Sequence, residues 1–188
     1  MRKFDYSFLK RISVPADIMN YATSIYEMKA KAELRRTDFA DVFSAMESVA
    51  KIQSVKSSNA IEGIITTDKR IRDIVNKSTA PQGHNELEIA GYRDALDLIH
   101  GSYSDIPFSE KSILELHRML LQPSGDDFAG KYKTEDNFIM ETDRRGVRSV
   151  RFTPVPASET SAAMEQLILA YHAAYSESEI NPLLLIPC

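Results

Sequence analysis

The residues with the clearest potential for chemistry lie in one short stretch, Ser57 to Thr67. Ser58 and Glu62 are four positions apart, so on a helix both side chains lie on one face. Gly63 follows directly and would let the backbone turn away, which places a carboxylate at the helix end. Such a carboxylate needs a cationic partner, and none lies nearby in the sequence. The same residues also suit an ordinary helix-to-loop junction with Gly63 as its cap.

The common signatures of catalytic sites are absent from the chain. It contains no GxxxxGK[ST], GxGxxG, HExxH or GxSxG pattern, so phosphate loops, zincins and hydrolase elbows are unsupported. The four histidines have no metal-ligand spacing and are more typical of helix surfaces or core positions: His84, His100, His117 and His172. A single cysteine, Cys188, excludes an intrachain disulfide and a zinc site built from cysteines. The sequence therefore predicts no catalytic residue and no metal site in this chain.

A cluster of arginines interrupts an otherwise acidic part of the chain: Arg144, Arg145, Arg148 and Arg151. Residues 81–188 carry nine basic and 17 acidic side chains, and the whole chain has a net charge of -4. This balance argues against a nucleic-acid-binding domain, which would concentrate basic residues on one element. Two interpretations of the cluster stay open, solubilising charge on an exposed turn and a contact with a phosphate or a partner.

The composition indicates an ordinary globular chain. Its 188 residues are 43% hydrophobic and 27% charged, enough for one well-buried core. No apolar run approaches the roughly 20 residues of a membrane span, and the N-terminus lacks an apolar signal core. We therefore expect a cytoplasmic protein without a membrane partner. The apolar end, residues 181–188, fits the opening of a core helix that is cut off, or a segment docked into the core.

The elements that position these residues are mostly helices. Helical spacing of apolar residues predicts helices over 18–32 and 39–53, after Thr67, over 89–99, from Ser109, from about residue 158 and from residue 182. Thr37 and Asp38 are expected to cap the second helix, and Gly101 is expected to end the fourth. The second helix carries one apolar stripe, made of Phe39, Val42, Phe43, Met46 and Val49 with Gln53.

The period changes after residue 123. Two short strand-like runs, 138–140 and 147–152, are joined through Asp143-Arg144-Arg145-Gly146, which suits a hairpin turn. The predicted fold class is therefore all-α, interrupted by one β-hairpin.

Four segments, in this order, carry a resemblance to a known family. Ser58 to Gly63 fits the pattern [S/T]-x-x-x-E-[G/N], and Gly130 to Lys133 is similar to G-x-[YF]-R, with lysine in place of arginine. Phe138 to Phe152, followed by Thr153-Pro154, resembles a flap hairpin, and Asn181-Pro182 resembles the start of a helix that leads into an active site. Together they resemble Fic-domain proteins over about residues 12–188. The implied fold is a Fic-like helical domain with one β-hairpin flap.

The resemblance implies two regions and an activity. Residues 1–80 would be an N-terminal helical region with an inhibitory helix, and residues 81–188 a partial Fic core with its flap hairpin. Fic proteins typically transfer AMP from ATP, with Mg²⁺, to a hydroxyl side chain of a target protein. Their signature, H-P-F-x-[D/E]-G-N-G-R, does not occur here. The resemblance thus implies a chain truncated before the catalytic loop and inactive alone. ATP and Mg²⁺ would serve the full-length parent, and neither is expected to bind this chain tightly.

The resemblance also assigns roles to residues. Ser58, Glu62 and Gly63 would form the inhibitory motif, in which Glu62 pairs with an active-site arginine and blocks productive placement of the ATP γ-phosphate. The flap would align an extended target segment edge to edge. The residues expected to form that edge are Val147, Arg148, Ser149, Val150 and Arg151.

A second hypothesis belongs to another class of protein. The chain would then be a non-enzymatic helical interaction module, a truncated Fic scaffold that binds a partner in the manner of an antitoxin. Self-association is left open under both hypotheses, whereas a nucleic-acid partner is disfavoured by the acidic balance.

Overall fold

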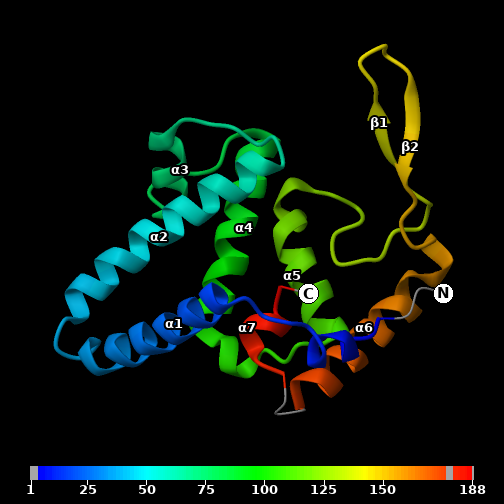
Figure 1. Ribbon diagram of the computed structural model, residues 1–188. Helices are drawn as coiled ribbons and strands as arrows, with labels where there is room; N and C mark the ends of the chain where they lie inside the picture. The colour runs from blue at the N-terminus through cyan, green and yellow to red at the C-terminus, as the bar shows by residue number, and fades with distance from the viewer. Residues whose placement is uncertain (1–3, 177–179, 188) are drawn as a thin grey trace. The chain divides into compact units, whose positions relative to one another are not determined.

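The protein is built mainly from helices, with one pair of strands among the described residues. A computed structural model describes residues 4–176 and 180–187 (Figure 1). The α-helices are α1 (Ala16–Arg35), α2 (Ala40–Ile61), α3 (Asp68–Val75), α4 (Gly83–Ser102), α5 (Glu110–Leu121), α6 (Thr160–Ser176) and α7 (Pro182–Leu185). The strands are β1 (Ile139–Thr142) and β2 (Arg148–Phe152). The prediction of an all-α fold with one hairpin is confirmed, while Cys188 lies outside the described residues.

Three helices begin at caps of the kind that sequence patterns predict. The side chain of Thr67 accepts the backbone N–H of Arg70 at 3.3 Å. Asn181 Oδ1 accepts the backbone N–H of Leu183 at 2.9 Å ahead of α7. Before α5, Ser109 Oγ accepts the N–H of Ser112 at 3.2 Å. Each cap satisfies an amide that has no partner within its helix.

Two predicted helix boundaries are wrong. Neither Thr37 nor Asp38 caps α2, because the Phe39 N–H already donates to the Arg35 carbonyl at 3.0 Å. The link from α1 therefore continues as a helical turn, and no side chain caps α2. Gly101 does not end α4, since the helix runs through it to Ser102 and a 3₁₀ turn, Tyr103–Asp105, follows.

The chain divides into two units, which we describe separately. The α2–α4 unit comprises residues 12–105 and 119–126, and the hairpin unit comprises residues 1–11, 106–118 and 127–188. Residue 80, the boundary expected from the resemblance, falls between α3 and α4, inside the α2–α4 unit. The division at residue 80 concerns the relation to the Fic family and stays a prediction.

The core of the α2–α4 unit forms where α2, α3 and α4 meet. Its buried side chains are Val55, Ile71, Ile74, Val75, Ile89 and Ala90. The helix predicted after Thr67 is confirmed as α3, and it buries Ile71, Ile74 and Val75. Gly91 lets α4 approach the end of α5, because a Cβ atom there would lie 2.3 Å from the Leu120 carbonyl oxygen. This contact permits no larger residue without a shift of the backbone.

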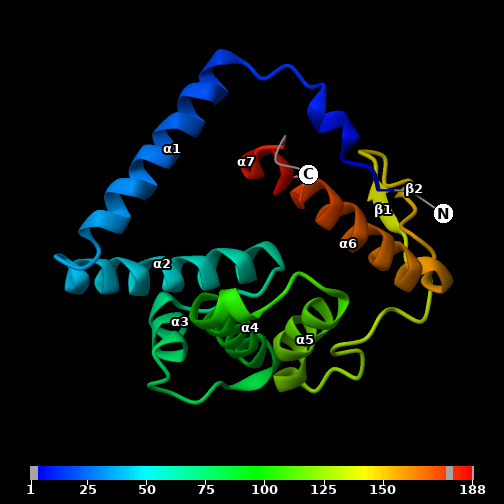
Figure 2. The same cartoon turned by 90° about the horizontal axis from the view of Figure 1, so that it is seen from below.

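The apolar stripe of α2 lies on one side of the helix, as its spacing indicates, but that side is not buried. Val42, Met46 and Val49 are exposed, whereas Val55 is completely buried. In both views α1 and α3 lie on opposite sides of α2 (Figures 1 and 2). The helix therefore packs into its unit through the side that bears Val55 and not through its longest apolar stripe.

The hairpin unit has its own small core and an exposed hairpin. Leu9, Ala174, Ile180 and Leu185 are buried together. The first described residues are attached to α6, since Gln166 Nε2 donates to the Phe4 carbonyl at 2.8 Å. β1 and β2 pair antiparallel, from Thr142 opposite Arg148 to Ile139 opposite Phe152, with an irregularity between Ile139 and Met140. Every residue of both strands is exposed.

Candidate functional site

The end of α2 is a well-defined backbone structure that presents Glu62. The Ile64 N–H donates to the Asn59 carbonyl at 2.9 Å, and the Gly63 N–H donates to the Ala60 carbonyl at 3.1 Å. These two bonds form a Schellman motif, which needs a residue in the left-handed region. Gly63 supplies it with φ of +80°, a conformation that costs glycine little. The backbone therefore turns away directly after Glu62, as the sequence predicts.

Two side chains hold this helix end in place. The hydroxyl of Tyr92 in α4 donates to Ser58 Oγ at 2.9 Å, which connects the turn of α2 that bears Ser58 to the neighbouring helix. Asn59 is buried, and its Nδ2 donates to the Val55 carbonyl at 2.8 Å within α2. Ile64 packs against the core beyond the turn. The position of Glu62 is thus determined by contacts on both sides of it.

Glu62 itself is exposed and belongs to the lining of a groove. Among the described residues its carboxylate forms no ion pair and no hydrogen bond. The groove, a cavity of about 760 Å³, is lined by Ser58, Asn59, Ile61, Glu62, Gly63, Ile64, Asn85, Glu88, Tyr92, Leu120 and Leu121. This lining holds two carboxylates and no lysine or arginine, so it favours a cationic group, such as a guanidinium, over a phosphate.

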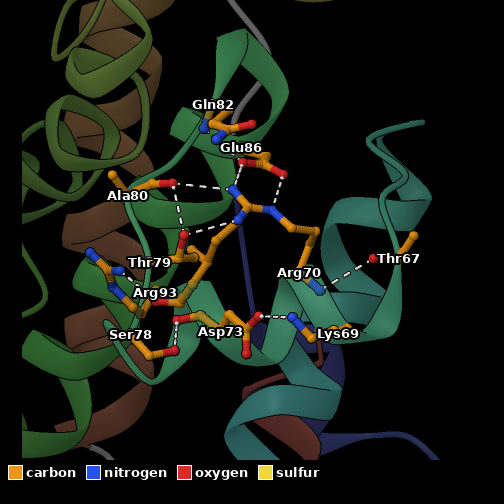
Figure 3. A network of polar contacts seen from close by, with 11 residues as sticks. Thr67, Lys69, Arg70, Asp73, Ser78, Thr79, Ala80, Gln82, Glu86 and Arg93 are labelled. Carbon is orange, nitrogen blue, oxygen red and sulfur yellow. Dashed lines mark hydrogen bonds and ion pairs between the residues drawn. The ribbon is translucent and has the colours of Figure 1, made fainter.

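A polar network fixes the link between α3 and α4 beside this groove (Figure 3). Arg70 donates through Nε to Glu86 Oε1 at 2.8 Å, and through a second nitrogen to Oε2 of the same carboxylate. It also donates to Thr79 Oγ1 at 2.9 Å and to the Ala80 carbonyl at 3.1 Å. The Gln82 N–H donates to Glu86 Oε2 at 2.6 Å. One arginine thereby closes the loop onto the first turn of α4.

The carboxylate of Glu86 is buried, and its charge is compensated. Hydrogen bonding from Arg70 holds the pKa of Glu86 below its usual value, although burial alone would raise it. Another arginine, Arg93, is itself buried and donates to the Ile74 carbonyl at 2.6 Å. These contacts are structural, and they fix the link between α3 and α4.

One cluster of possible metal ligands near the groove was not predicted from the sequence. His84, Glu88 and Asp126 each offer a ligand atom, and these atoms lie within 4.8 Å of one another. His84 and Glu88 occupy adjacent turns of α4, with Nε2 and Oε1 2.7 Å apart. An imidazole with two carboxylates is a donor set used for divalent transition metals. The i,i+4 spacing of His84 and Glu88 was readable in the sequence, but the proximity of Asp126 depends on how the end of α5 packs on α4.

The residues predicted to dock a target belong to the hairpin unit, whereas the Glu62 groove belongs to the α2–α4 unit. Arg148, Ser149, Val150 and Arg151 belong to β2, and Val147 directly precedes it. Arg151 lies 4.0 Å from Glu141 across the hairpin. Within the described part of the chain, Arg144, Arg145 and Arg148 have no acidic partner. The hairpin thus presents exposed arginines beside an unpaired strand edge.

The segment from Gly130 to Lys133 packs against α5. The Gly130 N–H donates to His117 Nδ1 at 3.0 Å, and a Cβ atom on Gly130 would lie 2.8 Å from Arg118 Cβ. Burial, together with the nearby Glu110 carboxylate, raises the pKa of Tyr132 to about 12. The Tyr132 hydroxyl is buried without a hydrogen-bond partner among the described residues. These contacts give Gly130 and Tyr132 structural roles.

Comparison with known proteins assigns no family to the chain: no protein-family model and no curated protein matches it. None of the helices in the described ranges combines the length and the apolar character that crossing a bilayer requires.

Proposed function

We propose that this chain is the regulatory and scaffold part of an autoinhibited Fic-type protein, one that transfers AMP from ATP to a hydroxyl side chain of a target protein. In such a reaction the hydroxyl oxygen bonds to the α-phosphorus, and pyrophosphate leaves. The chain contains no residue for this step, because it has no H-P-F-x-[D/E]-G-N-G-R signature. ATP and Mg²⁺ are accordingly assigned to a catalytic segment outside these 188 residues.

The observation that carries the proposal is the presentation of Glu62. Its carboxylate is exposed, lacks a partner among the described residues, and stands on a helix end fixed by the Gly63 turn and the Tyr92–Ser58 hydrogen bond. A fixed, unpaired carboxylate beside a groove without basic residues suits a bidentate bond with an arginine of a catalytic segment. An arginine held in this way could not bind the γ-phosphate of ATP.

The exposed hairpin supports the second part of the proposal. In β2 the segment from Arg148 to Arg151 offers backbone groups to an extended target segment, which would add to the hairpin as a further strand. The unpaired arginines on the same hairpin favour a target with acidic residues near its modified hydroxyl.

The decisive experiment replaces Glu62 in a protein that carries both this chain and a Fic catalytic signature. Glu62→Gly removes the carboxylate and should raise self-adenylylation with labelled ATP by about tenfold or more. The reason is that a hydrogen bond to a charged group contributes about 1.5–3 kcal/mol. Glu62→Gln should raise it as well, without the added backbone freedom of glycine. Glu47→Gln, at another exposed glutamate of α2, is the matched control and should change nothing. Equal activity of all four proteins would contradict the inhibitory role.

A non-enzymatic interaction module is the second candidate, and the exposed apolar faces of α1 and α2 favour it. The reading frame after Cys188 distinguishes the two candidates. A frame that continues into the catalytic signature supports the enzyme, whereas a stop codon at that point supports a binding module.

A further inference from the structure

The helix α2 has two apolar sides, and only one of them is covered. Val55 and Asn59 are buried against the rest of the α2–α4 unit. At 100° per residue, Val42, Met46 and Val49 lie about 120–180° around the helix from Val55. Met46 is 63% exposed. The apolar side of an amphipathic helix normally packs against the core of its own domain. The side of α2 that bears Val42, Met46 and Val49 does not.

The neighbouring helix α1 repeats the pattern. Its apolar residues recur at helical spacing, and none of its residues is buried. Tyr21 is 64% exposed. We call the exposed apolar residues of both helices the α1–α2 stripe, which consists of Ile18, Tyr21, Ile25, Met28, Phe39, Val42, Met46 and Val49.

The arrangement of the two helices makes the stripe accessible. α1 leaves the turn at residues 36–39 and diverges from α2, on the side of α2 away from α3 (Figure 2). The covered side of α2 faces α3 and α4, and Val42, Met46 and Val49 point away from that side to solvent. A further pair of helices could therefore pack against both members of the stripe.

The area of the stripe matches that of a stable interface. A large side chain exposes roughly 200 Å² when it is free, and the residues of the stripe are about half exposed. The stripe then offers roughly 800 Å², which is about what each partner contributes to a standard interface.

The charges beside the stripe favour a second copy of this chain as the occupant. Lys31 pairs with Glu27 at 2.5 Å, and Arg36 pairs with Glu47 at 2.5 Å. Because these charges are paired locally, the surroundings of the stripe carry no strong potential of one sign. They therefore favour neither an acidic nor a basic partner. A surface of balanced charge tolerates a copy of itself, because each copy brings the same mixture of signs.

We propose that the α1–α2 stripe is a self-association surface. Two copies join their helix pairs across a two-fold axis, and the stripe of one copy covers the stripe of the other in a four-helix arrangement. This inference does not depend on the proposed function, since it uses only the apolar faces of α1 and α2.

The test measures the mass of the full 188-residue chain in solution over a wide range of concentrations, by sedimentation and by light scattering. We expect a species of twice the 21.2 kDa of one chain. Met46→Glu and, separately, Tyr21→Glu should each weaken the dissociation constant of that dimer by at least about tenfold, because association would bury an unpaired carboxylate. Leu169→Glu, at an α6 residue that is also 63% exposed, is the matched control and should leave the constant unchanged.

Circular dichroism establishes whether each variant is folded. If Met46→Glu does not fold, Tyr21→Glu alone carries the test. A chain that stays monomeric at every concentration would overturn the proposal. So would a dimer that survives both stripe variants, or one that Leu169→Glu weakens as much as they do.

Discussion

The two ends of α2 have opposite environments. Its last turns carry Val55 and Asn59 into the core and end in the Gly63 motif. Its first turns carry Val42 and Met46 toward solvent. The buried end is fixed by hydrogen bonds and packing, and it presents Glu62, whereas the exposed end carries a surface ion pair between Arg36 and Glu47. A single helix can thus pack into its fold through one face while its other face stays accessible to a partner.

The largest effect is expected when the same charge is placed on the buried and on the exposed face of α2. Val55→Asp should cost at least about 3 kcal/mol of unfolding free energy, because it buries a carboxylate without a partner. Val49→Asp, six residues earlier on the exposed side, should stay within about 0.5 kcal/mol of the parent. Chemical denaturation at a concentration where the chain is monomeric measures both. Similar costs at the two positions would show that the exposed face is covered in solution.

A smaller effect is expected from two glycines of α4, which differ in their surroundings. Gly91→Ala should destabilise the protein by about 1–3 kcal/mol, since the new methyl group would overlap the Leu120 carbonyl oxygen. Gly101→Ala should stabilise it by about 0.5–1 kcal/mol, because the site is open and helical. Thermal unfolding of both variants gives the sign directly. If Gly91→Ala were also stabilising, the close approach of α4 to the end of α5 would be disproved.

The smallest expected effect concerns the acid sensitivity of the Arg70–Glu86 pair. The pKa of Glu86 is lowered in the folded state by the hydrogen bonds from Arg70. Its contribution to stability is therefore complete above the unfolded-state pKa and is lost as the pH falls through the folded-state pKa. Glu86→Gln should remove this part of the acid dependence, while Glu62→Gln at the exposed helix end should leave it in place. Unfolding curves between neutral and acidic pH test the difference, and an unchanged acid dependence in Glu86→Gln would contradict it.

The sequence predicted the parts of this structure that depend on neighbours along the chain. The caps at Thr67, Ser109 and Asn181 each use an amide two or three residues away. The turn at Gly63 needs only a left-handed residue. Local prediction failed at Thr37 and Gly101, where the backbone continued to form hydrogen bonds without the expected stop.

The sequence could not predict which apolar face would be covered. The stripe through Val42 and Met46 is regular enough to indicate a core face, yet burial goes to the face of Val55, which α3 and α4 cover. Contacts that join distant segments were equally inaccessible. The Tyr92–Ser58 hydrogen bond spans 34 residues, and Asp126 reaches His84 and Glu88 only through the packing of the α5 end. The Fic resemblance adds a functional interpretation to Ser58, Glu62 and Gly63, and that interpretation stays a prediction.

The hairpin has a practical consequence for work with this protein. No residue of β1 or β2 is buried, so the hairpin contributes little to the stability of its unit. Its tip, at Asp143 to Gly146, is accordingly the place where a protease should nick the folded chain first. The same tip can accept a purification tag or a fluorescent label, because its residues are exposed.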